Sequence, residues 1–271
     1  MPRPVPATVK GWLAIALTWN AGFVDAVGYL ILLHIYTAHM SGNSVALGIQ
    51  IADVNGYTIF EKGWPIVTFV VGLILCSLIN AAGERRHLRK VSSITLGLEA
   101  LLLAAFMALT PLLVGPRGLK TQPFYIFLLL VPLLTLAMGL QTSTLNRVGG
   151  LTLYTTYVTG TLAKFADGIA EYLTWVYEKT RGRSRHRKLQ VVRVSTRQKA
   201  LRESSLMAGL WLGYIAGAVS GTLVRRMWRS TALALPFVLL IFLIIVDQYR
   251  PIAPPSQKVQ KKETPSPETA G

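Results

Sequence analysis

A carboxylate lies in the middle of the first long apolar run of the chain. Asp25 occurs in the stretch Asn20-Ala-Gly-Phe-Val-Asp-Ala-Val-Gly-Tyr29. A charged side chain at that depth in a membrane costs about 2.5–3.5 kcal/mol on insertion scales, so Asp25 should face a cavity or a partner. Such a group could exchange a proton or bind a cation. It could equally accept hydrogen bonds from irregular backbone and hold the fold together.

Two polar residues flank Asp25 on the same expected helix. Tyr29 follows it by four residues and shares a helix face with it, whereas Asn20 precedes it by five and sits further round. Gly22 and Gly28 lie between them and would let another helix approach closely. We therefore treat Asn20 and Tyr29, together with Asp25, as candidate residues of a solute or ion site.

A polar segment, 36–52, follows the first apolar run with almost no loop between them. Ser41, Gly42 and Asn43 at its centre could break a helix, so that a half-helix begins near residue 44. The free N–H groups at such a start carry the positive end of the helix dipole. Split transporter helices use this arrangement to hold an anionic group of a solute.

A second interpretation of this segment is an unbroken helix, in which Ala38, Gly42 and Ala46 form a stripe of small packing residues. The polar side chains of His39 and Asn43 favour the break, because packing alone does not supply the polar neighbours they need inside a membrane. His39 is a further candidate site residue. We expect no metal site and no cofactor in this chain.

The same polar segment recurs in the second half of the chain. Segment 151–177 contains a stretch that aligns with 36–52 without a gap at an offset of 118 residues, and Thr159, Gly160 and Thr161 match the first Ser-Gly-Asn element. The identical pairs are Tyr36/Tyr154, Thr37/Thr155, Gly42/Gly160, Ile51/Ile169 and Ala52/Ala170. The repeat predicts two related halves, each with a broken or re-entrant helix.

Further polar candidates lie in later apolar runs. Lys164, one turn past Gly160, could pair with Asp25 or with a solute carboxylate, or extend to a membrane interface. The region equivalent to Asp25 in the other half contains Gln141, Thr142 and Asn146, which are polar but uncharged. Glu99 lies less than two turns into its run, close to a basic boundary, so we rank it below Asp25.

The composition indicates a membrane protein. Of 271 residues, 52% are hydrophobic and 15% are charged, whereas a soluble domain carries about 25% charged residues. The net charge of +16 comes from Lys and Arg in blocks between apolar runs, which is the pattern of the positive-inside rule and argues against a nucleic-acid partner. The single cysteine, Cys76, excludes an intrachain disulfide framework and a thiolate metal cluster.

These runs predict an all-α integral membrane protein. A span needs about 20 largely apolar residues. With both polar segments re-entrant and both termini cytoplasmic, 21 of the 28 Lys and Arg residues lie inside. Because each half then crosses the membrane three times, the second half has the opposite orientation to the first. This orientation leaves three arginines near residue 225 on the outside, which the positive-inside rule disfavours. The six predicted spans are 11–33, 65–82, 92–114, 123–145, 205–224 and 231–247.

The predicted organisation is a single transmembrane domain, 1–247, with halves of about 11–114 and 123–247. A basic cytoplasmic loop, 178–203, connects the polar segment of the second half to the next span. This loop could simply determine topology, or it could bind anionic lipid head groups. The tail, 248–271, is rich in Pro, Ser and Lys, which predicts a disordered cytoplasmic segment.

Three stretches resemble the YoaK-like family of bacterial membrane proteins, a domain of unknown function numbered 1275. The resemblance covers roughly residues 10–247 and places Asp25, Gly42, Asn43, Gly139 and Gly160 on motif positions. It implies an inner-membrane protein of about six spans and implies no activity. The stretches are Ala21-Gly-Phe-Val-Asp-Ala-Val-Gly-Tyr-Leu30, His39-Met-Ser-Gly-Asn-Ser44 with Gly48, and Gly139-Leu-Gln141 with Thr155-Thr-Tyr-Val-Thr-Gly-Thr-Leu162.

The function predicted from these features is secondary transport of a small solute, with an anion among the candidates and Asp25 coupling protons. The alternative is a non-transporting scaffold in the bacterial inner membrane whose loop 178–203 binds anionic lipid or a partner protein. We expect no enzyme, because the sequence has no Gly-x-Ser-x-Gly, no His-Glu-x-x-His and no Walker-type phosphate loop. The oligomeric state stays open.

Overall fold

The computed structural model describes residues 7–249 apart from 55, 87, 89, 116–117, 149–157 and 182–198. Within these residues the chain is helical and contains no strand, which confirms the predicted all-α class. The helices are α1 (Ala7–Ile31), α2 (Met40–Ala52), α3 (Gly56–Arg85), α4 (Val91–Leu113), α5 (Phe124–Val148), α6 (Val158–Thr180), α8 (Lys199–Trp228) and α9 (Ala234–Tyr249), with short 3₁₀ turns η1 (Leu119–Thr121) and η2 (Arg229–Leu233).

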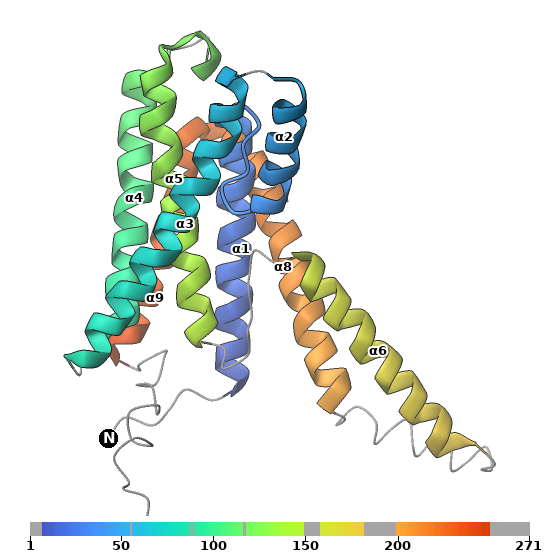
Figure 1. The fold of residues 1–271 in the computed structure, drawn as a ribbon. Helices are drawn as coiled ribbons and strands as arrows, with labels where there is room; N and C mark the ends of the chain where they lie inside the picture. The colour runs from blue at the N-terminus through green and yellow to red at the C-terminus, as the bar shows by residue number, and fades with distance from the viewer. Residues whose placement is uncertain are drawn as a thin grey trace, which may run out of the picture.

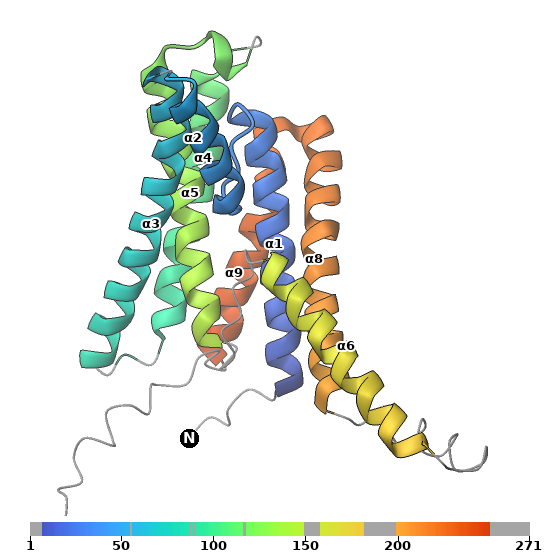
Figure 2. The same ribbon diagram turned by 45° about the vertical axis from the view of Figure 1, so that its right-hand side comes forward.

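Each of the six predicted spans falls on one of the long helices α1, α3, α4, α5, α8 and α9. By length and composition the described residues contain five candidate membrane-spanning segments, the last of which, Ala200–Tyr249, includes α8, η2 and α9. The chain reverses direction within that segment, because α9 runs back along the bundle after α8 (Figure 2).

The side chains are distributed as in a membrane protein. Large apolar residues such as Leu78, Leu101 and Leu112 are exposed on the outer faces of α3 and α4, while Asn, Gln and Glu side chains are buried inside the bundle. Lipid tails stabilise such apolar outer faces, and interior polar groups must find partners within the protein. The chain is therefore an integral membrane protein.

Glycines allow α1 and α8 to cross at very short distance. A Cβ atom at Gly22 would lie 2.1 Å from the carbonyl oxygen of Tyr214, and one at Gly217 would lie 2.1 Å from the carbonyl oxygen of Trp19. Side chains larger than hydrogen would push the backbones apart. Small residues at helix contacts are the usual means of close packing in membranes.

The contact between α3 and α5 repeats this crossing. A Cβ atom at Gly139 would lie 2.4 Å from the carbonyl oxygen of Phe69, and one at Gly72 would lie 2.6 Å from that of Leu136. Leu136 and Gly139 of α5 lie 117 positions after Trp19 and Gly22 of α1. Tyr214 and Gly217 of α8 lie 145 positions after Phe69 and Gly72 of α3. The two halves therefore make the same pair of backbone contacts.

The polar segments also occupy corresponding places. Helix α2 begins at Met40 and α6 begins at Val158, 118 residues later, which is the offset of the sequence repeat. Helix α2 packs on α3, and α6 packs on the corresponding helix α8. In Figure 1, α1 and α8 run away from the end that carries the N-terminus, while α3 and α5 run toward it.

The first polar segment is broken earlier than we predicted. Residues 32–39 form an irregular connection, and helix α2 begins at Met40 rather than near residue 44. Ser41, Gly42 and Asn43 therefore lie in the first helical turn. The alternative interpretation, a stripe of small residues that packs against another helix, also does not hold at Gly42. A Cβ atom there would lie 3.0 Å from the ring of Tyr36, which belongs to the preceding loop.

The second polar segment, 151–177, is described only in part. Residues 149–157 lie outside the described structure, and α6 continues through Gly160 without a break to Thr180. The predicted break at Thr159-Gly160-Thr161 is therefore wrong, since these residues form the start of the helix. Most of the basic loop and nearly all of the predicted tail also lie outside the described residues.

Candidate functional site

Asp25 accepts hydrogen bonds on both carboxylate oxygens. Oδ1 accepts the backbone N–H groups of Thr37, at 2.5 Å, and Ala38, at 2.9 Å, and also the hydroxyl of Thr37 at 3.2 Å. Oδ2 accepts the phenol hydroxyl of Tyr214 on α8. The residue is only 3% exposed. Asp25 thus joins α1, the irregular loop 32–39 and α8.

The local sequence explains why a carboxylate is needed here. After α1 ends at Ile31, the loop 32–39 runs alongside the helix, and the N–H groups of Tyr36, Thr37 and Ala38 bond to side chains rather than to backbone carbonyls. Unpaired backbone groups are costly at membrane depth, so a buried acceptor stabilises the loop. Gly28 makes room for it, because a Cβ there would lie 2.4 Å from Cγ2 of Thr37.

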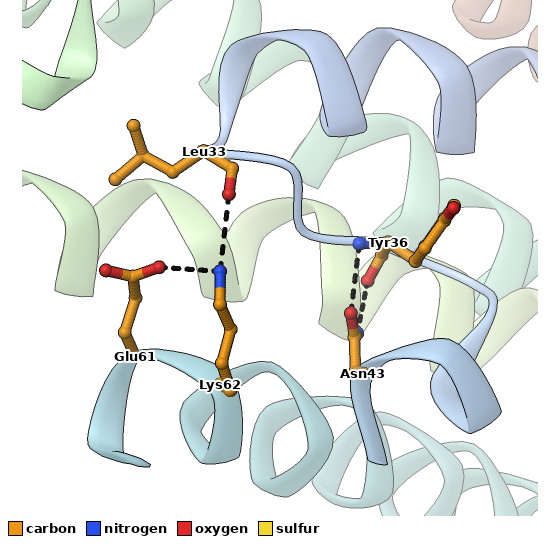
Figure 3. A network of polar contacts seen from close by, with 5 residues as sticks. All are labelled: Leu33, Tyr36, Asn43, Glu61 and Lys62. Carbon is orange, nitrogen blue, oxygen red and sulfur yellow. Dashed lines mark hydrogen bonds and ion pairs between the residues drawn. The ribbon is translucent and has the colours of Figure 1, made fainter. Parts of the chain in front are cut away.

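Side chains from α2 and α3 hold the same loop from the other side. Asn43 accepts the backbone N–H of Tyr36 at 3.1 Å and donates to its carbonyl oxygen at 2.6 Å. Lys62 donates to the carbonyl oxygen of Leu33 at 3.4 Å and pairs with Glu61 at 2.7 Å. Figure 3 shows both sets of contacts around the loop backbone. Three helices therefore fix the position of the loop.

Aromatic rings line the same region. The ring centroid of Tyr36 lies 4.7 Å from that of Tyr29 and 5.5 Å from that of His39, whose Nε2 lies 3.1 Å from the hydroxyl of Ser41. Partial burial, followed by the neighbouring Tyr29 and Asp25, raises the pKa of the Tyr36 phenol. Because the pKa rises from an already high value, this phenol stays protonated at neutral pH and can act as a donor.

A cavity of about 240 Å³ opens beside Asp25. Its polar lining comes from Asp25, Tyr29, Tyr36, Tyr214 and Thr222, and the remaining lining residues are Gly22, Ala26, Leu30 and Ala218. The carboxylate is therefore buried in protein but borders a space that a small solute or water could enter. Of the residues predicted for the site, Asp25 and Tyr29 line this cavity directly.

Asn20 and Gln141 form a second polar cluster, separate from Asp25. Nδ2 of Asn20 donates to Oε1 of Glu99 at 3.1 Å and to Oε1 of Gln141 at 2.7 Å, and Gln141 donates to the carbonyl oxygen of Leu17. Glu99 is 0% exposed. Within the described residues, Oε2 of Glu99 and Oδ1 of Asn20 have no hydrogen-bond partner.

Our ranking of Glu99 rested on a wrong expectation. It lies inside the bundle against Asn20 and does not reach the basic boundary. The sequence holds a signal for this, since Ser92, Thr95 and Glu99 are spaced as one helix face, and all three are buried. The sequence also did not single out Tyr214, which approaches Asp25 from 189 residues further along the chain.

The residues predicted on α6 do not join the Asp25 cavity. Thr159, Gly160, Thr161 and Lys164 lie on a helix that packs on α8, and none of them lines the cavity. Lys164 is exposed and is not among the partners of Asp25, so pairing with Asp25, one of the three alternatives that the sequence left open for Lys164, is not formed. The reason is that α6 lies against the part of α8 where Gly168 meets Ser204.

Comparison with known proteins gives the family. Residues 13–246 match the family described as "Protein of unknown function (DUF1275)". The chain belongs to this family. It is also 30% identical over 173 residues to the UPF0700 transmembrane protein YoaK of Bacillus subtilis (strain 168), which covers 64% of this chain and 73% of that protein. The comparison with solved structures gave no match. The resemblance seen in the sequence is thus confirmed.

Proposed function

We propose that this multi-pass membrane protein is a secondary transporter for a small solute, with an anion as the leading candidate and Asp25 coupling transport to protons. The observation that carries the proposal is the position of Asp25. Its carboxylate holds the backbone of a re-entrant loop and at the same time borders a cavity of about 240 Å³. Intramembrane ionisable residues of this kind mark solute and ion pathways.

The hydrogen bonds suggest how a proton would act. An ionised Asp25 accepts two backbone N–H groups and two hydroxyl groups, and charge-assisted bonds of this kind are the stronger ones. A proton on the carboxyl group removes that charge and weakens the attachment of loop 32–39 to α1. The loop and α2 can then shift together. Proton occupancy would thus bias a two-state element beside the cavity.

The repeated helix crossings support two inverted halves. The contact of α1 with α8 recurs as the contact of α5 with α3, and the second pair of helices runs in the opposite direction to the first (Figure 1). The polar segments also begin their helices at matching positions, with Ser41 in the first turn of α2 and Thr159 in the first turn of α6. Transporters built in this way change access by rocking one half against the other.

The topology of the proposal follows the charge distribution. Both termini and loop 178–203 would lie in the cytoplasm, with the protein in the bacterial inner membrane, because this arrangement places most Lys and Arg residues inside. No enzymatic activity is part of the proposal. The scaffold alternative rests on loop 178–203, most of which lies outside the described residues.

The test is proton movement in proteoliposomes that contain a trapped pH-sensitive dye. Small carboxylates and inorganic phosphate are added outside, and solute-dependent acidification is recorded. Asp25→Asn should remove the acidification while the protein remains folded, because an amide oxygen still accepts the N–H groups of Thr37 and Ala38. Glu99→Gln is the matched control, since Glu99 is also buried but does not line the cavity beside Asp25. Undiminished acidification with Asp25→Asn would exclude the coupling role.

A further inference from the structure

A larger cavity, of about 740 Å³, lies at the end of the bundle away from the N-terminus. It is formed where α1 ends, where α4 passes into the turn before α5, and where α8 passes into η2. Its described lining includes Lys120, Arg225, Arg229 and His34 and contains no acidic residue. The described side chains that line this cavity therefore carry a net positive charge, which would attract anions.

Arg225 has hydrogen-bonding capacity that the described residues do not use. Nη2 donates to the carbonyl oxygen of Leu30, near the C-terminal end of α1, at 3.1 Å. Nε is buried and has no partner within the described structure. A buried N–H of a guanidinium normally has an acceptor. Arg225 also lines the cavity, and a carboxylate or phosphate group there would be a suitable acceptor for its guanidinium.

The backbone around this cavity is held in unfavourable conformations. Leu33, His34 and Arg229 all have positive φ angles, at 55°, 60° and 51°, and all three line the cavity. Among the described non-glycine residues only Val54 shares this feature. Backbone strain of this kind is costly and tends to concentrate at ligand sites and switch regions.

Charge placement gives a further reason to expect a ligand. Arg225, in the last turn of α8, and Arg229, the first residue of η2, lie at the end of the bundle that our topology places outside, where the positive-inside rule disfavours basic residues. The carboxylate of Glu61, near the loop on the α3 side, is paired with Lys62 and so does not offset them. An anion that binds between the arginines would account for their presence.

We propose that this cavity binds a small water-soluble anion with a carboxylate or phosphate group, held by Arg225 and Arg229 with Lys120 at the side. Tyr29 and Leu30 line both this cavity and the one beside Asp25, so the bound anion would lie next to the coupling residue. The inference rests on the proposed function only for the claim that the anion is then transported. Binding itself stands or falls independently.

Trp228 provides a direct probe because it lines the cavity and is 51% exposed. Tryptophan fluorescence of the purified protein in lipid-free detergent is quenched with iodide, an anion, and with neutral acrylamide. The signal lost in Trp228→Phe defines the contribution of Trp228. We expect Arg229→Gln to lower the iodide quenching constant of that contribution about threefold, with acrylamide quenching unchanged, because the local anion concentration falls.

The matched control is Arg226→Gln, which removes the same charge from an exposed neighbour that does not line the cavity. It should leave iodide quenching of Trp228 nearly unchanged. Equal effects of the two substitutions would overturn the proposal, because they would report surface charge alone. Arg225→Gln tests the central residue, and Arg229→Gln keeps the test valid if loss of the bond to Leu30 prevents folding.

Competition identifies the class of ligand. Inorganic phosphate or acetate should protect Trp228 from iodide at constant ionic strength in the native sequence and not in Arg229→Gln. Protection by phosphatidylglycerol in mixed micelles, without protection by either soluble anion, would overturn the proposal in favour of a lipid site. Anion protection together with absent proton-coupled uptake would retain this site and reject the transporter function.

Discussion

The two buried carboxyl groups of this protein differ in what surrounds them. Asp25 has hydrogen-bond donors on both oxygens and borders a cavity. Glu99 has one bonded oxygen and one oxygen without a partner in the described structure, and it does not line the cavity beside Asp25. Asp25, which lies next to the irregular loop 32–39, is therefore the carboxyl group whose two oxygens both accept hydrogen bonds. Burial alone therefore does not distinguish the surroundings of these two carboxyl groups.

The physical origin of this difference is the backbone around each residue. Asp25 lies near the end of a helix, where the loop supplies free N–H groups that need an acceptor. Glu99 lies inside α4, where intrahelical bonds already use the backbone groups, so only side chains such as Asn20 can reach it. The first position suits a switch that couples a charge to a loop. The second suits packing specificity.

The largest expected effect comes from Asp25→Ala. This change leaves the N–H groups of Thr37 and Ala38 and the hydroxyl of Tyr214 without their acceptor. Since each buried unpaired group costs about 1–3 kcal/mol, the fold should lose about 3 kcal/mol or more. The loss of stability is measured by thermal unfolding in detergent, with size-exclusion chromatography as the readout of the protein that remains folded. A change of melting temperature no larger than that of Asp25→Asn would show that the loop does not depend on this acceptor.

An intermediate effect is expected for Tyr214→Phe. It removes one of the four donors to Asp25 and leaves both loop N–H bonds in place. The expected loss is about 1.5–3 kcal/mol, which is the usual contribution of a hydrogen bond to a charged group. The same unfolding assay applies. The double variant Asp25→Asn with Tyr214→Phe gives the interaction energy between the two residues. If the two single substitutions lower the free energy of unfolding by amounts that simply add in the double variant, the hydrogen bond between Tyr214 and Asp25 contributes nothing to stability.

The smallest expected effect, and one of opposite sign, is that of Glu99→Gln. The amide removes an ionisable group with no described ion-pair partner and brings an N–H donor into a cluster where Oδ1 of Asn20 lacks one. Stability should rise by up to about 1 kcal/mol, or stay constant. A clear loss of melting temperature, comparable to that of Asp25→Ala, would mean that Glu99 has a partner that the described residues do not include.

The sequence by itself determined the features that depend on local pattern. The apolar runs predicted the all-α membrane class, because spans need long apolar stretches whatever their neighbours are. The 118-residue repeat predicted where the two polar helices correspond, and α2 and α6 begin 118 residues apart. Asp25 also stood out locally, since a carboxylate within an apolar run requires a partner.

Only the tertiary structure decided which residues meet. Asp25 is held in place by Tyr214, and Asn20 joins Glu99 and Gln141 rather than Asp25, over sequence separations of 79 to 189 residues. No local pattern encodes these pairs, because they follow from glycine-mediated crossings that bring distant backbones together. Helix α2 begins at Met40 rather than near residue 44 for a non-local reason, since Asp25, Asn43 and Lys62 together hold the loop before it.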